Sequence, residues 1–294
     1  MITHPNVKIN LGLNVLRKRE DGFHDLETLF VPYFEISDTI EIIAGDDYSR
    51  TSATLFARYS GSFPSPQLAQ AVSDDGKVMI TIARAEGVDW NPLKDLTVKA
   101  YNVLAEDYEL PPVKIFLEKT SPVGAGLGGG SSDAAFALRM LNELFSLGLD
   151  DQRLAGYASR LGSDCAFFIY NRPMLGQGRG EILTPYSLEG FGYGQEGAPG
   201  LPFTVKVVVP EGISVSTAEA YRGITPHAPQ IPLSEALALP IDKWKDCLAN
   251  DFETTVFALH PQLSSIKASL YESGAVYASM SGSGSALFGI YPNH

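Results

Sequence analysis

The sequence has few cysteines and no long apolar run. Its two cysteines, Cys165 and Cys247, make no disulfide framework, and neither has a Cys or His neighbour at metal-ligand spacing. No stretch reaches the roughly 18 apolar residues that a membrane helix requires, and the first residues lack the apolar segment of a signal peptide. We therefore expect a cytoplasmic protein with reduced cysteines and no membrane partner.

Positive charge is also scarce. Lys and Arg number 22 against 34 Asp and Glu, so the formal net charge is −12, and no basic tract interrupts this background. Proteins that bind nucleic acid do so largely by neutralising phosphates with Lys and Arg, which excludes nucleic acid as the main partner. Glycine is in surplus, with 28 residues, and its clustering fits neither a collagen period nor a flexible linker.

The N-terminal part predicts a hairpin. Residues Val7–Val15 alternate between apolar and polar side chains, which predicts a half-buried strand with Lys8 and Asn10 on its polar face. After a polar turn that ends in Asp-Gly, a second strand over Phe23–Val31 is expected to pair back on the first.

The rest of the chain predicts an α+β fold without short repeats. Further strands are expected at 38–43, 79–83, 113–117, 203–209, 275–280 and 286–291, and the first two of these are expected to lie in antiparallel sheet. Helices are expected at 95–106, 132–148, 152–161, 217–222, 233–239, 250–259 and 262–273. The apolar run Cys165–Tyr170 predicts a buried strand, although its period does not distinguish it from a helix. The stretch 46–77 is expected to be mostly loop or an extra hairpin, and 190–202 to be a flexible loop. The division expected is a domain over 1–170 and another over 171–294.

A glycine-rich segment between a predicted strand and a predicted helix is the main clue to function. Its sequence, from Pro122, is PVGAGLGGGSSDA. Glycines let backbone N–H groups approach a phosphate closely, and a helix N-terminus adds about half a positive charge. The segment therefore has the composition of a phosphate-binding loop. The plainer alternative is that Ser131, Ser132 and Asp133 only cap the following helix.

Two other nucleotide-binding patterns fit this loop less well. Gly124, Gly126 and Gly129 satisfy the dinucleotide fingerprint, but that pattern requires the helix to lead into a parallel strand bearing an acidic residue. Here the predicted helix leads into another helix. The Lys of a Walker loop is also absent. An NAD-dependent oxidoreductase and a P-loop NTPase are both disfavoured.

Three separated segments together resemble the GHMP small-molecule kinases. They are Lys8-Ile-Asn10, the loop from Pro122 to Ala135, and Met280–Ala286, and they occur in the order of the three family motifs. The resemblance spans nearly the whole chain. It implies a two-lobed fold, with an N-terminal lobe like ribosomal protein S5 domain 2, a ferredoxin-like C-terminal lobe and the active site in the cleft between them.

More specific features point to one branch of that family. They are Asp21–His24, Leu29-Phe30, Gly162–Asp164, Gly180–Pro185 and Asn250–Glu253. The branch they resemble uses ATP and Mg²⁺ to phosphorylate the 2-hydroxyl of a cytidyl-diphosphate methylerythritol in the non-mevalonate route to isoprenoids. The alternatives are a mevalonate or homoserine type of GHMP kinase, or a catalytically silent nucleotide-binding protein on the same scaffold.

The resemblance also implies roles for individual residues. Asp164 would be the catalytic base, and Lys8 the partner that keeps it ionised and faces the transferring phosphate. Lys119 would lie near the base or ribose of ATP, and Ser132 would be a ligand of Mg²⁺. The other residues expected to bind ATP are Pro122, Val123, Gly124, Ala125, Gly126, Leu127, Gly128, Gly129, Gly130, Ser131 and Ser132.

The acceptor is expected to contact a second group of residues. Phe23 and Tyr221 would stack on the two faces of the cytosine, His24 would bind its edge, and Asn10 and Thr217 would hydrogen-bond the same ligand. One position departs from the family pattern. Asp95 stands where the family usually has an Asn that helps to bind adenine, and an ionised carboxylate only accepts hydrogen bonds. The sequence is compatible with a monomer or a homodimer.

Overall fold

The computed structural model describes residues 1–48, 67–188 and 203–293. The predicted loop at 190–202 and much of that at 46–77 therefore lie outside the described residues. Contacts divide the chain into two compact units, each made of separate stretches. The first comprises Met1–Val7, Phe34–Ser121 and Gly129–Tyr170, and the second Lys8–Tyr33, Pro122–Gly128 and Asn171–His294. One break follows Tyr170, and the two-domain division expected from the sequence stays a prediction.

The first unit contains a five-stranded sheet in the order β1-β4-β7-β6-β5. Its strands are β1 Ile2–Thr3, β4 Thr39–Ala44, β5 Gln67–Val72, β6 Val78–Arg84 and β7 Val113–Lys119. Residues 79–83 were expected in antiparallel sheet, yet β6 runs parallel to β7 and antiparallel only to β5. The reason is that β7 lies between β4 and β6, whereas the sequence suggests that consecutive strands are neighbours.

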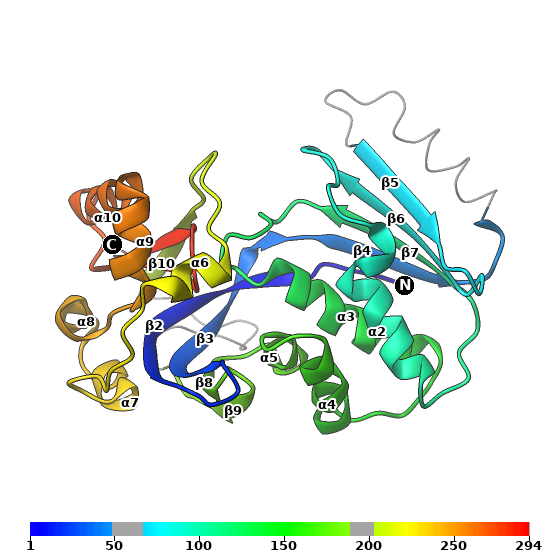
Figure 1. The fold of residues 1–294 in the computed structure, drawn as a ribbon, viewed down its shortest axis with the longest axis horizontal. Helices are drawn as coiled ribbons and strands as arrows, with labels where there is room; N and C mark the ends of the chain where they lie inside the picture. Colours follow the sequence, from blue (N-terminus) through cyan, green and yellow to red (C-terminus); the bar gives the residue numbers. More distant parts are fainter. Residues whose placement is uncertain (49–66, 189–202, 294) are drawn as a thin grey trace. The chain divides into compact units, whose positions relative to one another are not determined.

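Helices cover one face of this sheet, as Figure 1 shows for α2 and α3. The helical elements of the unit are η1 Pro92–Lys94, α2 Leu96–Ala105, α3 Gly129–Leu144, α4 Asp151–Leu161 and α5 Cys165–Tyr170. Helix α3 buries Ala134, Leu138 and Leu141 at helical spacing, as predicted. It ends at Leu144, before Gly148, which has a φ of +68° in the turn that follows.

The strand predicted over Cys165–Tyr170 is wrong, because this segment is helix α5. Five of its six residues are buried, and it packs on α3 and α4. A helix buried all around shows neither the period of a strand nor that of an amphipathic helix. Its sequence therefore carried no signal that distinguishes the two.

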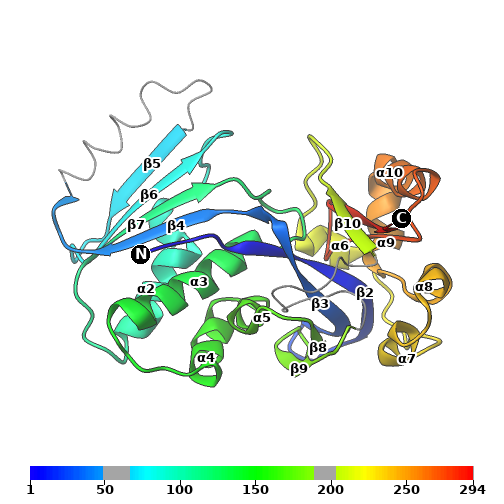
Figure 2. The ribbon, with the colours of Figure 1, turned by 180° about the vertical axis from the view of Figure 1, so that it is seen from behind.

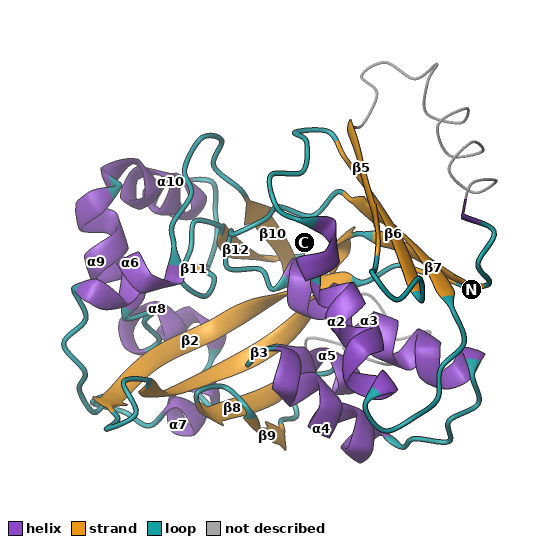
Figure 3. Cartoon of the chain, turned by 45° about the vertical axis from the view of Figure 1, so that its right-hand side comes forward, coloured by secondary structure: helices purple, strands orange, loops and turns teal. Residues whose placement is uncertain are grey.

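A four-stranded sheet in the order β2-β3-β8-β9 carries the hairpin expected at the N-terminus. Its strands are β2 Asn6–Lys18, β3 His24–Ser37, β8 Met174–Gly178 and β9 Ile182–Pro185. The half-buried character expected for the first strand is wrong, since Lys8 and Asn10 are each only 2% exposed. Figure 3 shows this sheet with its strands in orange.

The second unit also contains a three-stranded antiparallel sheet in the order β10-β12-β11. Its elements are β10 Phe203–Val208, β11 Tyr277–Met280 and β12 Leu287–Pro292, with α6 Thr217–Arg222, α7 Leu233–Leu237, α8 Ile241–Cys247, α9 Phe252–Leu259 and α10 Pro261–Glu272. Helices α6, α9 and α10 lie near this sheet in Figures 1 and 2 and share a core with it that includes Val256, Leu263 and Leu287. The sequence predicted all of these elements except α8.

No helix within the described ranges has both the length and the apolar character needed to cross a bilayer.

Candidate functional site

The glycine loop packs tightly against the loop between β11 and β12, both in the second unit. Gly126 has a φ of +76°, and a Cβ placed on it would lie 2.1 Å from the carbonyl oxygen of Ser281 and 3.0 Å from the amide nitrogen of Gly284. Close by, the amide of Ala286 donates to the carbonyl of Ala125 at 3.0 Å. The two loops are in direct contact, and only glycine fits at position 126.

A buried lysine joins this loop to strand β2. The Lys8 ammonium donates to the Gly126 carbonyl at 2.7 Å and to Asn10 Oδ1 at 2.6 Å. Ser281 Oγ donates to the same carbonyl at 3.0 Å. Lys8 and Asn10 therefore share one strand face, as predicted, and the ammonium places a positive charge beside the glycine loop.

The polar face of β2 tolerates burial because its side chains are hydrogen-bonded. Asn10 Nδ2 donates to Thr28 Oγ1 at 3.0 Å, and that hydroxyl donates to the Gly12 carbonyl at 2.5 Å. Buried polar groups are stable only with such partners. Thr28 holds the amide of Asn10 so that its oxygen faces Lys8.

In the first unit, helix α3 begins directly after the loop, at Gly129. The first backbone N–H groups of an α-helix have no partner within the helix, and the helix dipole favours an anion at that end. In this first turn, Ser132 Oγ is buried and has no hydrogen-bond partner among the described residues. A hydroxyl of this kind fits a phosphate oxygen or an Mg²⁺ ion, which takes few protein ligands and keeps bound water. The described ranges contain no group of three or more His, Cys, Asp or Glu arranged to hold a metal.

The turn that carries Asp164 lies beside the first turn of α3. The Ser131 hydroxyl hydrogen-bonds the thiol of Cys165, and a Cβ on Gly162 would come within 3.9 Å of Ser131 Oγ. Burial raises the pKa of Cys165 to about 12, so the thiol is not a nucleophile at neutral pH. Asp164 itself is partly exposed and accepts a hydrogen bond from Ser163 Oγ at 3.2 Å. The structure therefore brings the turn that carries the proposed base beside Ser131.

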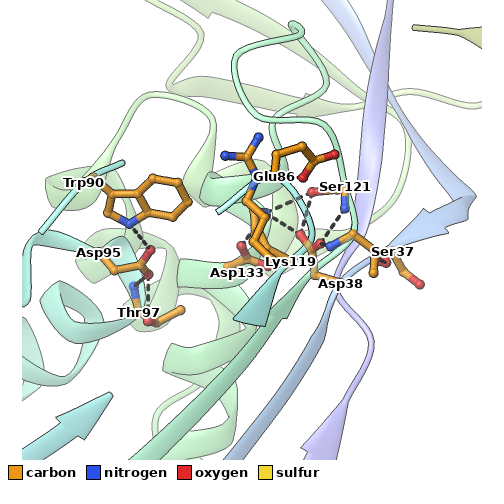
Figure 4. A network of polar contacts seen from close by, with 11 residues as sticks. Ser37, Asp38, Glu86, Trp90, Asp95, Thr97, Lys119, Ser121 and Asp133 are labelled. Carbon is orange, nitrogen blue, oxygen red and sulfur yellow. Dashed lines mark hydrogen bonds and ion pairs between the residues drawn. The ribbon is translucent and has the colours of Figure 1, made fainter. Parts of the chain in front are cut away.

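A buried polar cluster lies under the start of α3 (Figure 4). The Lys119 ammonium donates to Asp38, to Ser121 Oγ at 2.9 Å and to Asp133 Oδ2 at 2.8 Å. An ammonium has three N–H groups, so these contacts use all of them. The predicted contact of Lys119 with ATP stays a prediction, and it would require one of these bonds to break.

The two aspartates of the cluster differ in their pKa. Burial would raise the pKa of Asp38, but the Lys119 charge and the hydrogen bonds from Ser121 outweigh it and hold that pKa below its usual range. Burial raises the pKa of Asp133 well above its usual range; Lys119 opposes this rise and the charge of Asp38 adds to it. Asp38 is therefore the ionised partner of Lys119.

Asp95, the residue that departs from the family pattern, caps helix α2. Its carboxylate accepts from the Thr97 amide at 2.9 Å, from Thr97 Oγ1 at 2.7 Å and from Trp90 Nε1 at 3.2 Å (Figure 4). All three partners are donors, which is the role that an ionised carboxylate can fill.

The residues expected to bind the acceptor lie on β2, on β3, on α6 and in the turn before β3. The His24 ring stacks on Tyr221 with centroids 4.6 Å apart and an interplanar angle of 18°. Phe23 is 54% exposed, and the guanidinium of Arg179 lies 5.0 Å from its ring centroid. Thr217 Oγ1 is 3.4 Å from Ser283 Oγ. The cytosine sandwich between Phe23 and Tyr221 stays a prediction, because the ring found against Tyr221 is that of His24.

Sequence reasoning missed two residues of the buried cluster, Asp38 and Ser121. Asp38 appeared only as the first residue of a strand, and its ion-pair partner Lys119 is 81 positions away along the chain. No local pattern connects them. The one available signal was an acidic residue directly before an alternating apolar strand, which is also common in turns.

Comparison with known proteins identifies the class. The family models described as "GHMP kinases N terminal domain" and "GHMP kinases C terminal" match residues 95–172 and 234–294. A solved homoserine kinase from Cytophaga hutchinsonii has a TM-score of 0.63 over 99% of this chain and 86% of its own, at 16% identity, which shows a shared fold. The chain belongs to the GHMP kinases, and the α+β fold of that family predicted from the sequence is confirmed.

Within the family, several relatives that match nearly the full length of the chain share one name. A Bacteroides fragilis protein named 4-diphosphocytidyl-2-C-methyl-D-erythritol kinase is 42% identical over 291 residues, which cover 99% of this chain and 92% of the relative. A crystal structure of 4-(cytidine 5'-diphospho)-2C-methyl-D-erythritol kinase has a TM-score of 0.70 and 29% identity over 98% of this chain and 89% of that one. The resemblance drawn from the motifs is confirmed.

The close approach at Gly126 predicts a large effect of a single methyl group. Gly126→Ala places a methyl group on a left-handed backbone and also pushes it into the Ser281 carbonyl. Gly274→Ala is the control: Gly274 has a φ of +99° but no atom within 4 Å of its Cβ position, so this variant has only the cost of the left-handed backbone. The left-handed conformation costs about 1–2 kcal/mol and overpacking a further ~1–3 kcal/mol. Urea unfolding should show the larger loss for Gly126→Ala; equal losses would contradict the packing described.

Proposed function

We propose that this protein transfers the γ-phosphoryl group of ATP to the 2-hydroxyl of 4-diphosphocytidyl-2-C-methyl-D-erythritol, a step of the non-mevalonate route to isoprenoids. The observation that carries the proposal is the buried Lys8 ammonium, bonded both to Asn10 and to the glycine loop. A protein that only bound a nucleotide would not need the buried Lys8 ammonium to be bonded to Asn10, a residue expected to contact the acceptor. The names and identities of the full-length relatives support the choice of acceptor.

Phosphoryl transfer requires an acceptor hydroxyl held in line with the γ-phosphate, removal of its proton, and stabilisation of the charge on the moving group. We assign proton removal to Asp164, whose carboxylate can accept the hydroxyl proton as the new O–P bond forms. Lys8 supplies positive charge to the transferring phosphoryl. The proton then resides on Asp164, and ADP is the leaving group.

The ATP phosphates would lie against the glycine loop and the first turn of α3. The loop glycines Gly124, Gly126 and Gly128 all have positive φ, so their N–H groups can take directions that other residues rarely allow. Ser131 and Ser132 add hydroxyls at the helix start. Ser132 Oγ would be the protein ligand of Mg²⁺, which when bound neutralises charge on the phosphate oxygens.

The acceptor would be held by Asn10, Phe23, His24, Thr217 and Tyr221. An aromatic stack is worth about 1–3 kcal/mol per base in nucleic-acid complexes, which gives a reason for rings at this position. Neutral His24 offers one donor and one acceptor nitrogen to the edge of a cytosine. We place the reaction in the cytoplasm, where ATP is available, with the protein acting as a monomer or a homodimer.

The acceptor decides between this proposal and its rivals. With ATP and Mg²⁺, the purified protein should release ADP with the cytidyl-diphosphate acceptor and not with mevalonate or homoserine, as measured by a coupled ADP assay. Activity only on mevalonate or homoserine would overturn the acceptor assignment. ATP binding without turnover of any of the three would favour the catalytically silent alternative.

Replacing the proposed base should abolish turnover and spare ATP binding. General-base contributions are typically about 10²–10⁴-fold, so Asp164→Ala should lower kcat by at least about 100-fold while the affinity for ATP stays within about threefold. Ser163→Ala, which removes the neighbouring hydroxyl of the same turn, serves as the matched control and should remain near the wild-type rate. A residual rate above about a tenth for Asp164→Ala would place the base elsewhere.

The pKa of His24 predicts a pH effect on acceptor binding. Burial, with a smaller contribution from the Lys18 charge, lowers this pKa below its ordinary value of 6.5. The imidazole is therefore mainly neutral at pH 6.5 and above, and KM for the cytidyl acceptor should rise as the pH falls below that value. Protonation leaves only donors, which face the amino group of the cytosine unfavourably.

The matched variant for this pH effect is His24→Gln, whose amide keeps a donor and an acceptor at every pH. Its acceptor KM should lack the rise at low pH. If the rise persists in the variant, another group causes it.

A further inference from the structure

The buried cluster around Lys119 connects the two ends of the glycine loop. Lys119 and Ser121 stand immediately before the loop segment 122–128, and Gly129 and Asp133 stand immediately after it. The ammonium of Lys119 bonds both Ser121 Oγ, at 2.9 Å, and Asp133 Oδ2, at 2.8 Å. One cation thus links the chain entering the loop to the chain leaving it.

Asp38 holds the residues that immediately precede the loop in place. One of its carboxylate oxygens accepts from the amides of Thr120 and Ser121, each at 2.7 Å. The other accepts from Ser121 Oγ at 2.6 Å and from the Lys119 ammonium. The Asp38 side chain is fully buried, and its own amide donates to the Pro5 carbonyl at 3.0 Å. Four donors on one carboxylate fix the backbone at the residues where the loop begins.

The end of the loop that leads into α3 is held by direct packing. A Cβ on Gly129 would lie 2.4 Å from Ser121 Oγ and 3.2 Å from Lys119 Nζ, so the first residue of α3 rests on the cluster with no room for a side chain. The contacts to Asp133, one turn further, keep the helix start against it (Figure 4). Both ends of a seven-residue segment are therefore fixed relative to each other.

We propose that Asp38 and Lys119 are positioning residues that hold both ends of the glycine loop, so that its N–H groups are arranged for ATP phosphates before ATP binds. This inference rests on the proposed role of the loop in ATP binding. Fixing the loop in advance removes the entropy that would otherwise be lost when the nucleotide orders it. Lys119 acts here through the loop, since its three N–H groups are already bonded within the cluster.

Two isosteric variants on the same lysine test this proposal. Asp38→Asn replaces an oxygen that accepts two bonds with an NH₂ group, which then faces either the Lys119 ammonium or the backbone amides. Asp133→Asn keeps an oxygen for Lys119 and places its NH₂ where Asp133 Oδ1 has no partner among the described residues. Asp38→Asn should therefore raise KM for ATP at least tenfold, and Asp133→Asn less than about threefold. KM for the acceptor should stay within twofold in both.

A double-mutant cycle separates positioning from direct contact with ATP. If Lys119 acts through the cluster, Lys119→Met and Asp38→Asn disrupt the same unit, and the double variant should bind ATP about as weakly as the worse single variant. If Lys119 contacts ATP by itself, the two effects multiply, and this result would overturn the inference.

Two further measurements keep the inference testable without the kinase assay. Equilibrium binding of ADP, without acceptor, should weaken at least tenfold in Asp38→Asn, and amide exchange at residues 122–128 of the free protein should be faster than in the wild type. If Asp38→Asn does not fold, Ser121→Ala, which removes only the bridging hydroxyl, should show faster exchange and a twofold to fivefold weaker affinity for ADP. Unchanged exchange and affinity in the folded variant would overturn the inference, whichever acceptor the enzyme uses.

Discussion

The structure of the second unit depends on one close approach between backbone segments, that of Gly126 to Ser281. Because no side chain intervenes, the Gly126 carbonyl can accept both from the Lys8 ammonium and from Ser281 Oγ. This single oxygen therefore connects strand β2, the glycine loop and the loop after β11. In the proposed function, the same absence of side chains lets backbone N–H groups approach a phosphate. The packing of the two loops and the proposed phosphate binding would then depend on the same glycine.

Two of the positive charges in this acidic protein are buried. Lys8 and Lys119 are 2% and 7% exposed, and each is bonded to oxygens of its own unit. A buried charge interacts more strongly than a surface charge, because less water screens it. Lys8 brings its charge to the glycine loop directly. Lys119, as proposed, instead holds the two ends of the loop in place. A net charge of −12 is compatible with two such local cations.

Much of this organisation could be predicted from the sequence. The hairpin of β2 and β3 and the helices α2, α3, α4, α6, α9 and α10 all follow from local period and turn residues. Helix α5 could not, since six consecutive apolar and aromatic residues have no distinguishing period. The parallel pairing of β6 with β7 could not either, because strand order depends on contacts distant in sequence.

The sequence by itself determined the family, because the glycine loop and the other family motifs are contiguous segments whose composition reflects backbone requirements. Only the tertiary structure decided how the polar residues are paired. Asp38 lies between β3 and β4 and Lys119 at the end of β7, and His24 on β3 stacks on Tyr221 of the distant helix α6. Neither pairing has a local signature, since each arises when sheet formation and helix packing bring separate segments together. Burial and the charged or hydrogen-bonding partners that it brings together determine the direction of the pKa shifts of Asp38 and His24.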